Sequence, residues 1–533
     1  MSHPSYDYII IGAGSAGCVL ARRLTEDARV KVLLLEAGGP DKRQEIHIPA
    51  AFNKLFKTEC DWAYETEELE QMKRRRMFWP RGKVLGGSSS INAMVYSRAN
   101  RGDHDGWRAL GIEGWSYSDI LPYYKKSENN ERFVGRGANE YHGTGGELNV
   151  ADLRCVNPLT HHFVEAAQGA GLKFNEDLNG ASQEGVGILQ VTQKNGQRHS
   201  AAAAFLKPSL TRANLTVQTG AQVTRLLFDK QRAVGVEYVQ NGQTAQARTN
   251  REVILSGGTI NSPQTLLLSG IGPAEQLRAW DLPVVADLPG VGQNLQDHLL
   301  IGVEYECREP IGLHKADNFK NILHYLLFKK GPLTSNVAEA AAFLKTDASM
   351  AVPNIELVFA PVFYMDNGFK NPDLHGFSIG IALQKPESRG QLKLRSKDPF
   401  TAPAIQPNYL AAENDLTACI EGVKIARQIL GAKSFDRFRG KEWWPGAAAT
   451  TDDDIAEHIR QTAETIYHPV GTCRMGSARD ALAVVDDRLR VRGVEGLRVV
   501  DASVIPTQIT GHTNAPVLAI AEKAAGLIGA ENG

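Results

Sequence analysis

The sequence predicts an α/β protein in which a doubly wound, mainly parallel-sheet domain carries an inserted α+β domain on a mixed sheet. Three observations support this fold class. The chain opens with a buried strand, a glycine-rich turn, a helix and a second buried strand. From about residue 305 to 460 it changes to strand segments mixed with helices. Its 533 residues also exceed what one hydrophobic core usually supports.

The first domain is therefore expected to be discontinuous along the chain. We assign residues 1–155, 199–305 and 463–533 to it. Residues 156–198 and 306–462 are assigned to the second domain, which is expected to bind the substrate.

The first element is the apolar run at residues 7–11 (DYIII), typical of a strand buried on both faces of a parallel sheet. The motif GAGSAG at 12–17 follows, then a helical stretch to residue 24 and a second buried strand at 30–35. A glycine motif between such a strand and helix is the Rossmann-like fingerprint of a dinucleotide site. Nicotinamide and flavin dinucleotides share this motif, so by itself it leaves both open.

Each residue of this motif has an expected role. Gly12 permits the tight turn, Gly14 lets a pyrophosphate approach the backbone, and Gly17 lets the helix pack closely on the strand. The helix start at Ser15 presents N–H groups to the phosphates. Glu36, at the end of the second strand, can accept hydrogen bonds from a ribose diol.

Composition excludes several classes of function. The formal net charge is −1 and no basic stripe runs along the chain, which argues against a nucleic-acid partner. The six cysteines are scattered without CxxC or Cys/His metal spacing, so we expect a reduced cytoplasmic protein without a metal site. No apolar run reaches the roughly 18 residues of a membrane-spanning helix.

Four later segments indicate a family. The small-residue loop at 82–92 (GKVLGGSSSIN), with Tyr96 and Asp105 behind it, lets a backbone lie against a flat ligand. Together with the segments at 258–272, 290–298 and 496–506, it resembles the glucose-methanol-choline oxidoreductases. This resemblance covers nearly the whole chain and implies FAD as the cofactor. It implies cofactor contacts for further residues, namely Ala37, Val84, Gly87, Asn92, Val95, Val223, Asp501 and Ala502.

Two segments near the C-terminus carry the catalytic candidates, YHPVGTCRMG at 467–476 and GHTNAP at 511–516. Histidine titrates near neutrality, so it can accept a hydroxyl proton while a hydride leaves the carbon for flavin N5. The resemblance assigns the base to His468 and the neighbouring hydrogen-bond donor to Asn514. His512 stays a competitor for the second role, whereas His298 is expected to be structural.

The resemblance also bears on how FAD is held and what the enzyme oxidises. Some family members bind FAD through a histidine in the glycine-rich loop; that position is Ile91 here, so we expect non-covalent FAD. The stretches 78–96, 191–206, 331–343 and 464–476 are most similar to acceptor-linked alcohol dehydrogenases of bacterial alkane oxidation, and next to choline dehydrogenases. That implies oxidation of a primary alcohol to an aldehyde with a quinone or another non-oxygen acceptor. An oxygen-using alcohol oxidase, a hydroxynitrile lyase and an NAD enzyme stay open as alternatives.

A quinone acceptor would place the enzyme against the inner membrane. Residues 318–333 offer a candidate contact, because apolar residues recur there at helical spacing between lysines. The alternative is a helix packed on its own protein.

Overall fold

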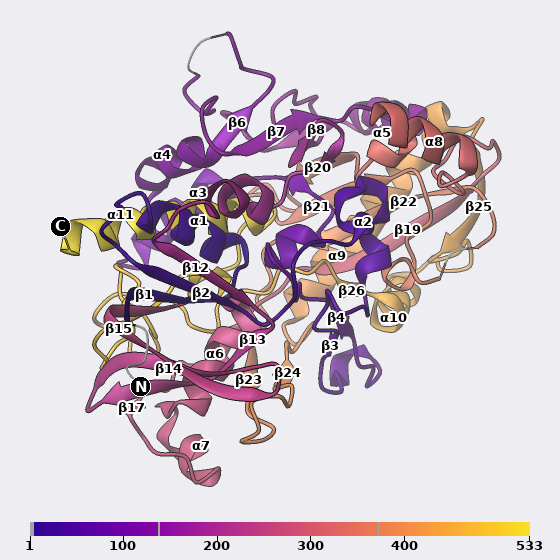
Figure 1. The fold of residues 1–533 in the computed structure, drawn as a ribbon. Helices are drawn as coiled ribbons and strands as arrows, with labels where there is room; N and C mark the ends of the chain where they lie inside the picture. The colour runs from indigo at the N-terminus through magenta and orange to yellow at the C-terminus, as the bar shows by residue number, and fades with distance from the viewer. Residues whose placement is uncertain (1–4, 137–138, 371, 533) are drawn as a thin grey trace.

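The computed structural model describes residues 5–136, 139–370 and 372–532 and contains two large sheets (Figure 1). The first sheet has the strand order β12-β2-β1-β15-β14-β13, with β27 also paired to β15. Its strands are β1 (Ser5–Ile11), β2 (Val32–Glu36), β12 (Leu215–Thr219), β13 (Ala221–Asp229), β14 (Arg232–Gln240), β15 (Gln243–Leu255) and β27 (Leu497–Val499).

The centre of this sheet is parallel and mainly apolar. β1 pairs in parallel with β2 and with the end of β15, and residues 32–36 of β2 are all buried. Strands covered on both faces read as continuous apolar runs, as the sequence indicated. Helix α1 (Ser15–Leu24) packs on β1 and β2 and lies beside α11 (Asn514–Asn532). The predicted Rossmann-like βαβ unit is confirmed.

The second sheet has the strand order β25-β19-β22-β21-β20-β8, with β26 paired to β19. Its strands are β8 (Gly185–Ile188), β19 (Leu299–Cys307), β20 (Ala340–Leu344), β21 (Ile355–Ala360), β22 (Gly376–Leu383), β25 (Arg439–Trp444) and β26 (Glu464–Thr465). Helices α5 (Pro158–Gly169) and α9 (Glu413–Leu430) pack on this sheet.

The α/β fold class is confirmed with one correction. Every pairing of the second sheet among the described residues is antiparallel, so this sheet is not mixed. The physical reason is its connectivity: β20, β21 and β22 follow one another through loops, and parallel neighbours would need crossover helices between them. The strand patterns alone did not reveal this, because alternation does not specify strand direction.

The two sheets support a two-domain division, which we keep as a proposal. Elements from 156–198 (α5 and β8) pack on the second sheet, as the division requires. β19 starts at Leu299, so the second sheet begins a few residues before the expected boundary at 305.

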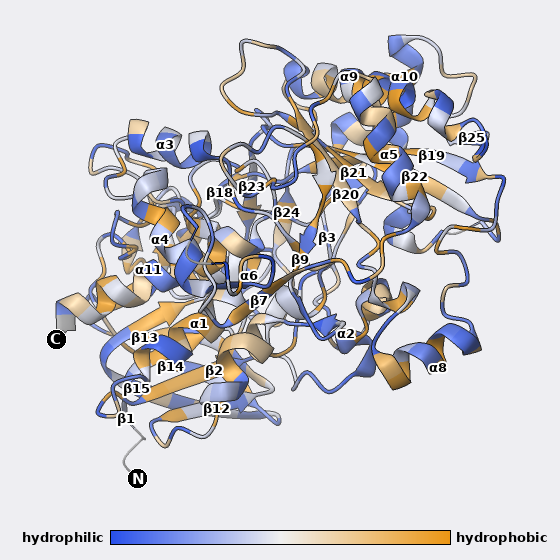
Figure 2. Cartoon of the chain, turned by 90° about the horizontal axis from the view of Figure 1, so that it is seen from above, coloured by the Kyte–Doolittle hydropathy of each residue, from blue (hydrophilic) through white to orange (hydrophobic). Residues whose placement is uncertain are grey.

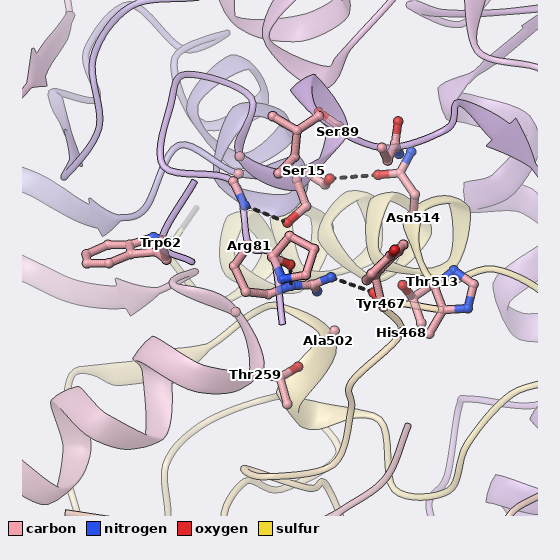
Figure 3. A pocket seen from close by; sticks show the side chains of 18 of the residues that line it. Ser15, Trp62, Arg81, Ser89, Thr259, Tyr467, His468, Ala502, Thr513 and Asn514 are labelled. Carbon is pink, nitrogen blue, oxygen red and sulfur yellow. Dashed lines mark hydrogen bonds between the residues drawn. The ribbon is translucent and has the colours of Figure 1, made fainter. Parts of the chain in front are cut away.

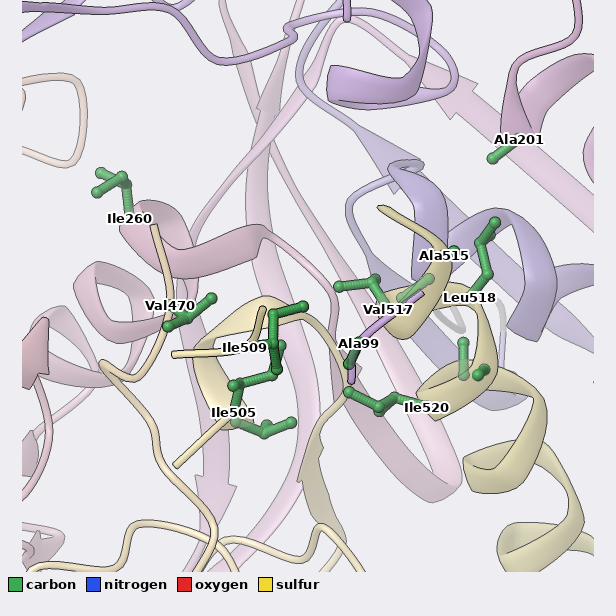
Figure 4. Close-up of a cluster of buried hydrophobic side chains, with 14 of the residues drawn as sticks. Ala99, Ala201, Ile260, Val470, Ile505, Ile509, Ala515, Val517, Leu518 and Ile520 are labelled. Carbon is green, nitrogen blue, oxygen red and sulfur yellow. The ribbon is translucent and has the colours of Figure 1, made fainter. Parts of the chain in front are cut away.

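A buried core joins the C-terminal segments that surround the site. Val470, Ile505 and Ile509 are fully buried, in one hydrophobic cluster with Val517 and Leu518 of α11 (Figure 4). This packing fixes the two segments that carry the catalytic candidates relative to the first sheet.

Candidate active site

A cavity of about 330 Å³ lies between the first sheet and the second sheet. It collects residues from segments far apart in the sequence (Figure 3). The predicted site residues that line it are Gly12, Gly14, Ser15, Glu36, Ala37, Gly87, Asn92, Val95, Val223, His468, Asp501, Ala502 and Asn514. Gly17 and Val84 are not among the lining residues.

Those two residues support the lining loops from behind. A Cβ added at Gly17 would lie 1.9 Å from the carbonyl oxygen of Gly12, so only glycine lets α1 approach the turn this closely. Val84 is buried and forms a bridge with Gly39, and its carbonyl accepts a hydrogen bond from the Gly87 N–H at 2.7 Å. The second glycine loop is held against the first by the Gly86 N–H, which donates to the Ala13 carbonyl at 2.7 Å.

Glu36 sits at the end of β2, where its carboxylate closes the glycine turn. Its Oε2 accepts from the Ala13 N–H and its Oε1 from the Gly38 N–H, both at 2.8 Å. Burial raises the pKa of Glu36 to about 7, against the lowering effect of these hydrogen bonds. The Glu36 carboxylate, which is expected to accept hydrogen bonds from a ribose, therefore already lies at the cavity wall.

The nucleotide end of the cavity fits a dinucleotide cofactor. The N-cap of α1 at Gly14 has no side-chain cap, which leaves the first N–H groups of the helix facing the cavity. A Cβ at Gly14 would meet only Ser256 O, at 3.9 Å, so the turn has room on this side. Ser256 Oγ is buried and has no hydrogen-bond partner within the described part of the chain. A bound phosphate or ribose could satisfy both features.

Asp501 is held by four hydrogen bonds and shapes the far wall of this region. Its Oδ2 accepts from Gly258 N at 2.8 Å and Ser262 Oγ at 2.6 Å. Its Oδ1 accepts from the N–H and hydroxyl of Ser503 at 2.8 and 2.5 Å. The carboxylate thus ties the start of α6 (Gly258–Leu268) to the C-terminal strand and presents Ala502 to the cavity.

His468 lies on a loop whose backbone is fixed on both sides. Its N–H donates to Asp297 Oδ1 at 2.7 Å, and its carbonyl accepts from Gln508 Nε2 at 2.9 Å. The preceding residue, Tyr467, has a φ of 72°, an uncommon backbone state for a bulky residue. Arg81 Nη2 donates to the Tyr467 carbonyl at 2.6 Å (Figure 3). A strained turn held in this way indicates that the position of His468 is functionally constrained.

The hydrogen bonds of His298 define the tautomer of His468. His298 Nε2 lies 2.9 Å from the Ile509 carbonyl oxygen, which can only accept, so this nitrogen carries a proton. Burial lowers the pKa of His298 to about 3, so its Nδ1 has no proton at neutral pH. That Nδ1 lies 3.0 Å from His468 Nδ1, which must therefore donate. The remaining nitrogen of His468, Nε2, is an unprotonated acceptor.

Electrostatics keep His468 in this neutral form. Burial, followed by the nearby His512, His298 and Arg81, lowers its pKa well below the usual range. An alcohol proton can therefore be transferred to Nε2 without first displacing another proton.

Asn514 begins α11 and points toward the start of α1. The Ser15 hydroxyl donates to Asn514 Oδ1 at 2.7 Å, which turns the amide so that Nδ2 is left to donate (Figure 3). His512 lies nearby, with its ring 4.7 Å from the ring of His468. Its Nε2 is 3.0 Å from Glu356 Oε1, a partner that already engages this histidine. The geometry therefore leaves Asn514 as the better-placed neutral donor.

Sequence reasoning missed three contributors to this site. His298 was expected to be only structural, yet its Nδ1 contacts the catalytic candidate directly. Arg81 and Glu304 were not predicted, although both line the cavity. For His298 and Arg81 the signal was their place in the family-like segments 290–298 and 78–96. For Glu304 no sequence signal existed, because its strand reads as an ordinary alternating one.

Comparisons with known proteins agree with this fold. Residues 6–300 and 386–521 match the N- and C-terminal parts of the GMC oxidoreductases. An alcohol dehydrogenase [acceptor] of Pseudomonas putida is 46% identical over 98% of this chain and 95% of its own length. The mitochondrial choline dehydrogenase of Mus musculus is 44% identical over 98% of this chain and 89% of its own length.

Solved structures are similar over their full lengths. Pyridoxine 4-oxidase from Mesorbium loti aligns with a TM-score of 0.89 and 32% identity over 98% of both chains. A formate oxidase aligns with a TM-score of 0.93 and 27% identity over 100% of this chain and 99% of its own.

A glycine-loop nucleotide site beside a buried histidine is the arrangement expected of a dinucleotide-dependent oxidoreductase. The chain belongs to the GMC oxidoreductase family, whose members bind FAD.

Proposed function

We propose that this enzyme oxidises a primary alcohol to an aldehyde, with His468 as the base. The proposal rests on the His298–His468 contact, which leaves His468 Nε2 as an acceptor inside the cavity. Asn514 is the proposed donor that holds the substrate oxygen while its proton leaves. The relative named alcohol dehydrogenase [acceptor], 46% identical over nearly the whole chain, supports this choice of substrate class.

FAD, when bound, would supply the hydride acceptor that alcohol oxidation requires. The proposed contacts are the glycine turn, Glu36, the second glycine loop, Val223 and the segment at Asp501. We propose that FAD is held without a covalent bond, because Ile91 lines the cavity where a loop histidine would be needed. Flavin released into the supernatant after acid precipitation supports this; flavin that stays with the pellet contradicts it.

We further propose a quinone or another non-oxygen compound as the electron acceptor. Support comes from the word acceptor in the name of the Pseudomonas putida relative. Two alternatives have relatives of their own: oxygen-dependent choline dehydrogenases at 45–46% identity and pyridoxine 4-oxidase among the solved structures. These alternatives differ from the proposal in the substrate or in the use of oxygen.

The decisive experiment is an anaerobic absorbance spectrum of the FAD-loaded enzyme, before and after addition of 1-alkanols, aryl alcohols and choline. Loss of the flavin band with 1-alkanols supports the proposal, whereas loss only with choline favours choline oxidation. Air is then admitted. Rapid recolouring with peroxide identifies an oxidase, and slow recolouring that a quinone accelerates supports the dehydrogenase. No bleaching with any alcohol contradicts the proposed reaction.

We propose a cytoplasmic enzyme that contacts the inner membrane through α8 (Phe319–Phe328). No helix among the described residues is long and apolar enough to cross a membrane. α8 instead exposes six large apolar side chains, with Phe319 80% and Leu327 65% exposed. α8 lies at the edge of the molecule, and part of its ribbon has the orange of hydrophobic residues (Figure 2).

The way in which α8 is attached supports contact with the membrane rather than packing of this helix on its own protein. Tyr325 is its single buried residue, and the Tyr325 hydroxyl donates to the His47 and Gly196 carbonyls at 3.1 and 3.3 Å. Lys320 and Lys330 are exposed at the two ends, where they can meet anionic lipid headgroups. An exposed apolar stripe flanked by lysines matches an interfacial helix.

A further inference from the structure

Beyond His468 the cavity continues over one face of the second sheet, opposite the face on which α9 packs. Residues that lie opposite each other on β19, β22 and β21 form rows across this face. In the first row, Ala382 lies between Leu300 and Glu356. Glu356 holds His512 beside His468. In the second row, Gly302 faces Gly380, and Val358 lies next to that glycine. Neither glycine adds a side chain to this face, and both line the part of the cavity that runs over the strands between Leu300 and Glu304, which we call the slot.

The walls of this slot are apolar and its size depends on the glycines. A Cβ at Gly380 would lie 2.8 Å from Leu300 Cδ1, so the Leu300 side chain covers this glycine, and a side chain at 380 would push Leu300 into the slot. Val358 and Ala360 form the opposite wall. An alkyl chain that starts at His468 can lie along these rows without losing hydrogen bonds.

The slot ends at Glu304 in the third row. This side chain is fully buried, and its Oε2 accepts from the Tyr364 N–H at 3.2 Å. Its Oε1 has no hydrogen-bond partner within the part of the chain that the structure describes. A Cβ at Gly302 would lie 3.1 Å from this Oε1, so the carboxyl leans back along the slot toward His468.

Glu304 is a neutral acid in this setting. Burial raises its pKa to about 8; the Tyr364 N–H and the Ser378 side chain act to lower the pKa, and the nearby Glu464 adds to the rise. The Ser378 hydroxyl, which lies across from it, donates to the Val362 carbonyl at 2.6 Å, so that proton is already used. A buried polar atom without a partner is costly, which points to a group that enters the slot and pairs with it.

We propose that Glu304 binds a second hydroxyl group at the far end of a linear primary alcohol, so that a medium-length diol is the preferred substrate. This inference rests on the proposed function, because it places the reacting hydroxyl at His468. The distance between the two ends is one to two rows of the sheet, roughly 7–13 Å along the strands.

A hydroxyl matches Glu304 better than a cationic group does. A protonated carboxyl offers one donor and one acceptor, and a hydroxyl can pair with both. An ammonium group would require ionised Glu304, against the burial that favours its neutral form. Glu464, another carboxyl that lines this cavity, already accepts from the Asn367 N–H at 2.8 Å.

The test compares diols with 1-alkanols of matched length, about six to ten carbons, in anaerobic flavin bleaching by the FAD-loaded enzyme. The wild type should reach half-saturation at a diol concentration at least about tenfold below that for the matched alkanol. Glu304→Leu should abolish this ratio, whereas Glu304→Gln, which keeps a donor and an acceptor, should retain most of it. Amino alcohols of the same length are included as the cationic probe.

A second variant keeps the test independent of folding at position 304. Gly302→Ala places a methyl group against Glu304 Oε1 and should weaken diol use more than use of a short alkanol. Flavin content confirms that each variant is folded. Equal saturation by diol and alkanol, a ratio unchanged in Glu304→Leu, or a preference for the amino alcohol would each overturn this inference alone. Absence of bleaching by every alcohol would overturn the proposed function and this inference with it.

Discussion

The Nδ1 atoms of His298 and His468 lie 3.0 Å apart, although the two residues are 170 positions apart in the sequence. Because His298 Nε2 donates to a backbone carbonyl, His298 can only accept at Nδ1 while it is neutral. We therefore propose that His298 is a positioning residue: it keeps the proton of His468 on Nδ1 and leaves Nε2 as the acceptor of the proposed base. Their rings meet edge to face, with centroids 5.2 Å apart, which also restricts the orientation of the base.

Replacing His298 should change catalysis without removing the base. In His298→Ala the partner of His468 Nδ1 is lost, so the rate constant for flavin bleaching should fall about 10²-fold with little change in KM. His298→Asn keeps an acceptor near the Nδ1 position and should recover part of the rate. A purely structural role predicts that both variants lose FAD or unfold together, which flavin content and thermal unfolding would reveal.

The low pKa of His468 predicts the acid limb of the pH–rate profile. The neutral base is the active form, and burial with neighbouring positive charge lowers its pKa well below 6.5. Activity on saturating alcohol should therefore stay constant from neutral pH down through 6.5 and decline only at lower pH. Stopped-flow bleaching across pH measures this, and a decline centred at or above 6.5 would contradict it.

Asn514 should contribute as a hydrogen-bond donor. Asn514→Asp keeps the size of the side chain but replaces Nδ2 by a carboxylate oxygen, which repels a developing alkoxide. Flavin bleaching should slow about 10²–10³-fold. Ser15→Ala is the matched control: it removes the hydrogen bond to Asn514 Oδ1 and should cost much less. Equal losses in the two variants would show that amide orientation, not donation, matters.

Because buried Glu304 is neutral, the Glu304→Gln variant is expected to become more stable than the wild type as pH rises. The folded pKa of this carboxyl is raised to about 8, so its contribution to stability is present below its unfolded pKa and is lost as pH rises through 8. Glu304→Gln cannot ionise. Its free energy of unfolding, relative to the wild type, should increase by several kcal/mol between pH 5 and pH 8. Denaturant unfolding at the two pH values checks this, and a constant difference would contradict it.

The exposed face of α8 predicts binding to lipid vesicles. Replacing both Leu326 and Leu327 by Glu should lower the affinity for anionic vesicles at least about tenfold, because two apolar side chains no longer bury in the interface. Bleaching by alcohol should be unchanged. Leu110→Glu, at another exposed leucine, is the control and should bind like the wild type. Wild-type protein that does not sediment with vesicles would remove the membrane proposal.

The sequence by itself determined the nucleotide-binding unit and the main catalytic candidate. The βαβ unit depends on local features: an apolar run, glycines at 12, 14 and 17, and Glu36 at the end of the second strand. Such features act over a few residues, so their geometry follows from their spacing. The segment around His468 was also recognisable, because the motif itself is contiguous.

Only the tertiary structure decided how these parts act together. The tautomer of His468 depends on His298, and the slot depends on Gly302 and Gly380 meeting across two strands. The antiparallel pairing of the second sheet, the unpaired oxygen of Glu304 and the exposure of α8 are likewise results of packing. Contacts between distant segments are set by strand direction, register and burial, and one-dimensional patterns do not specify these.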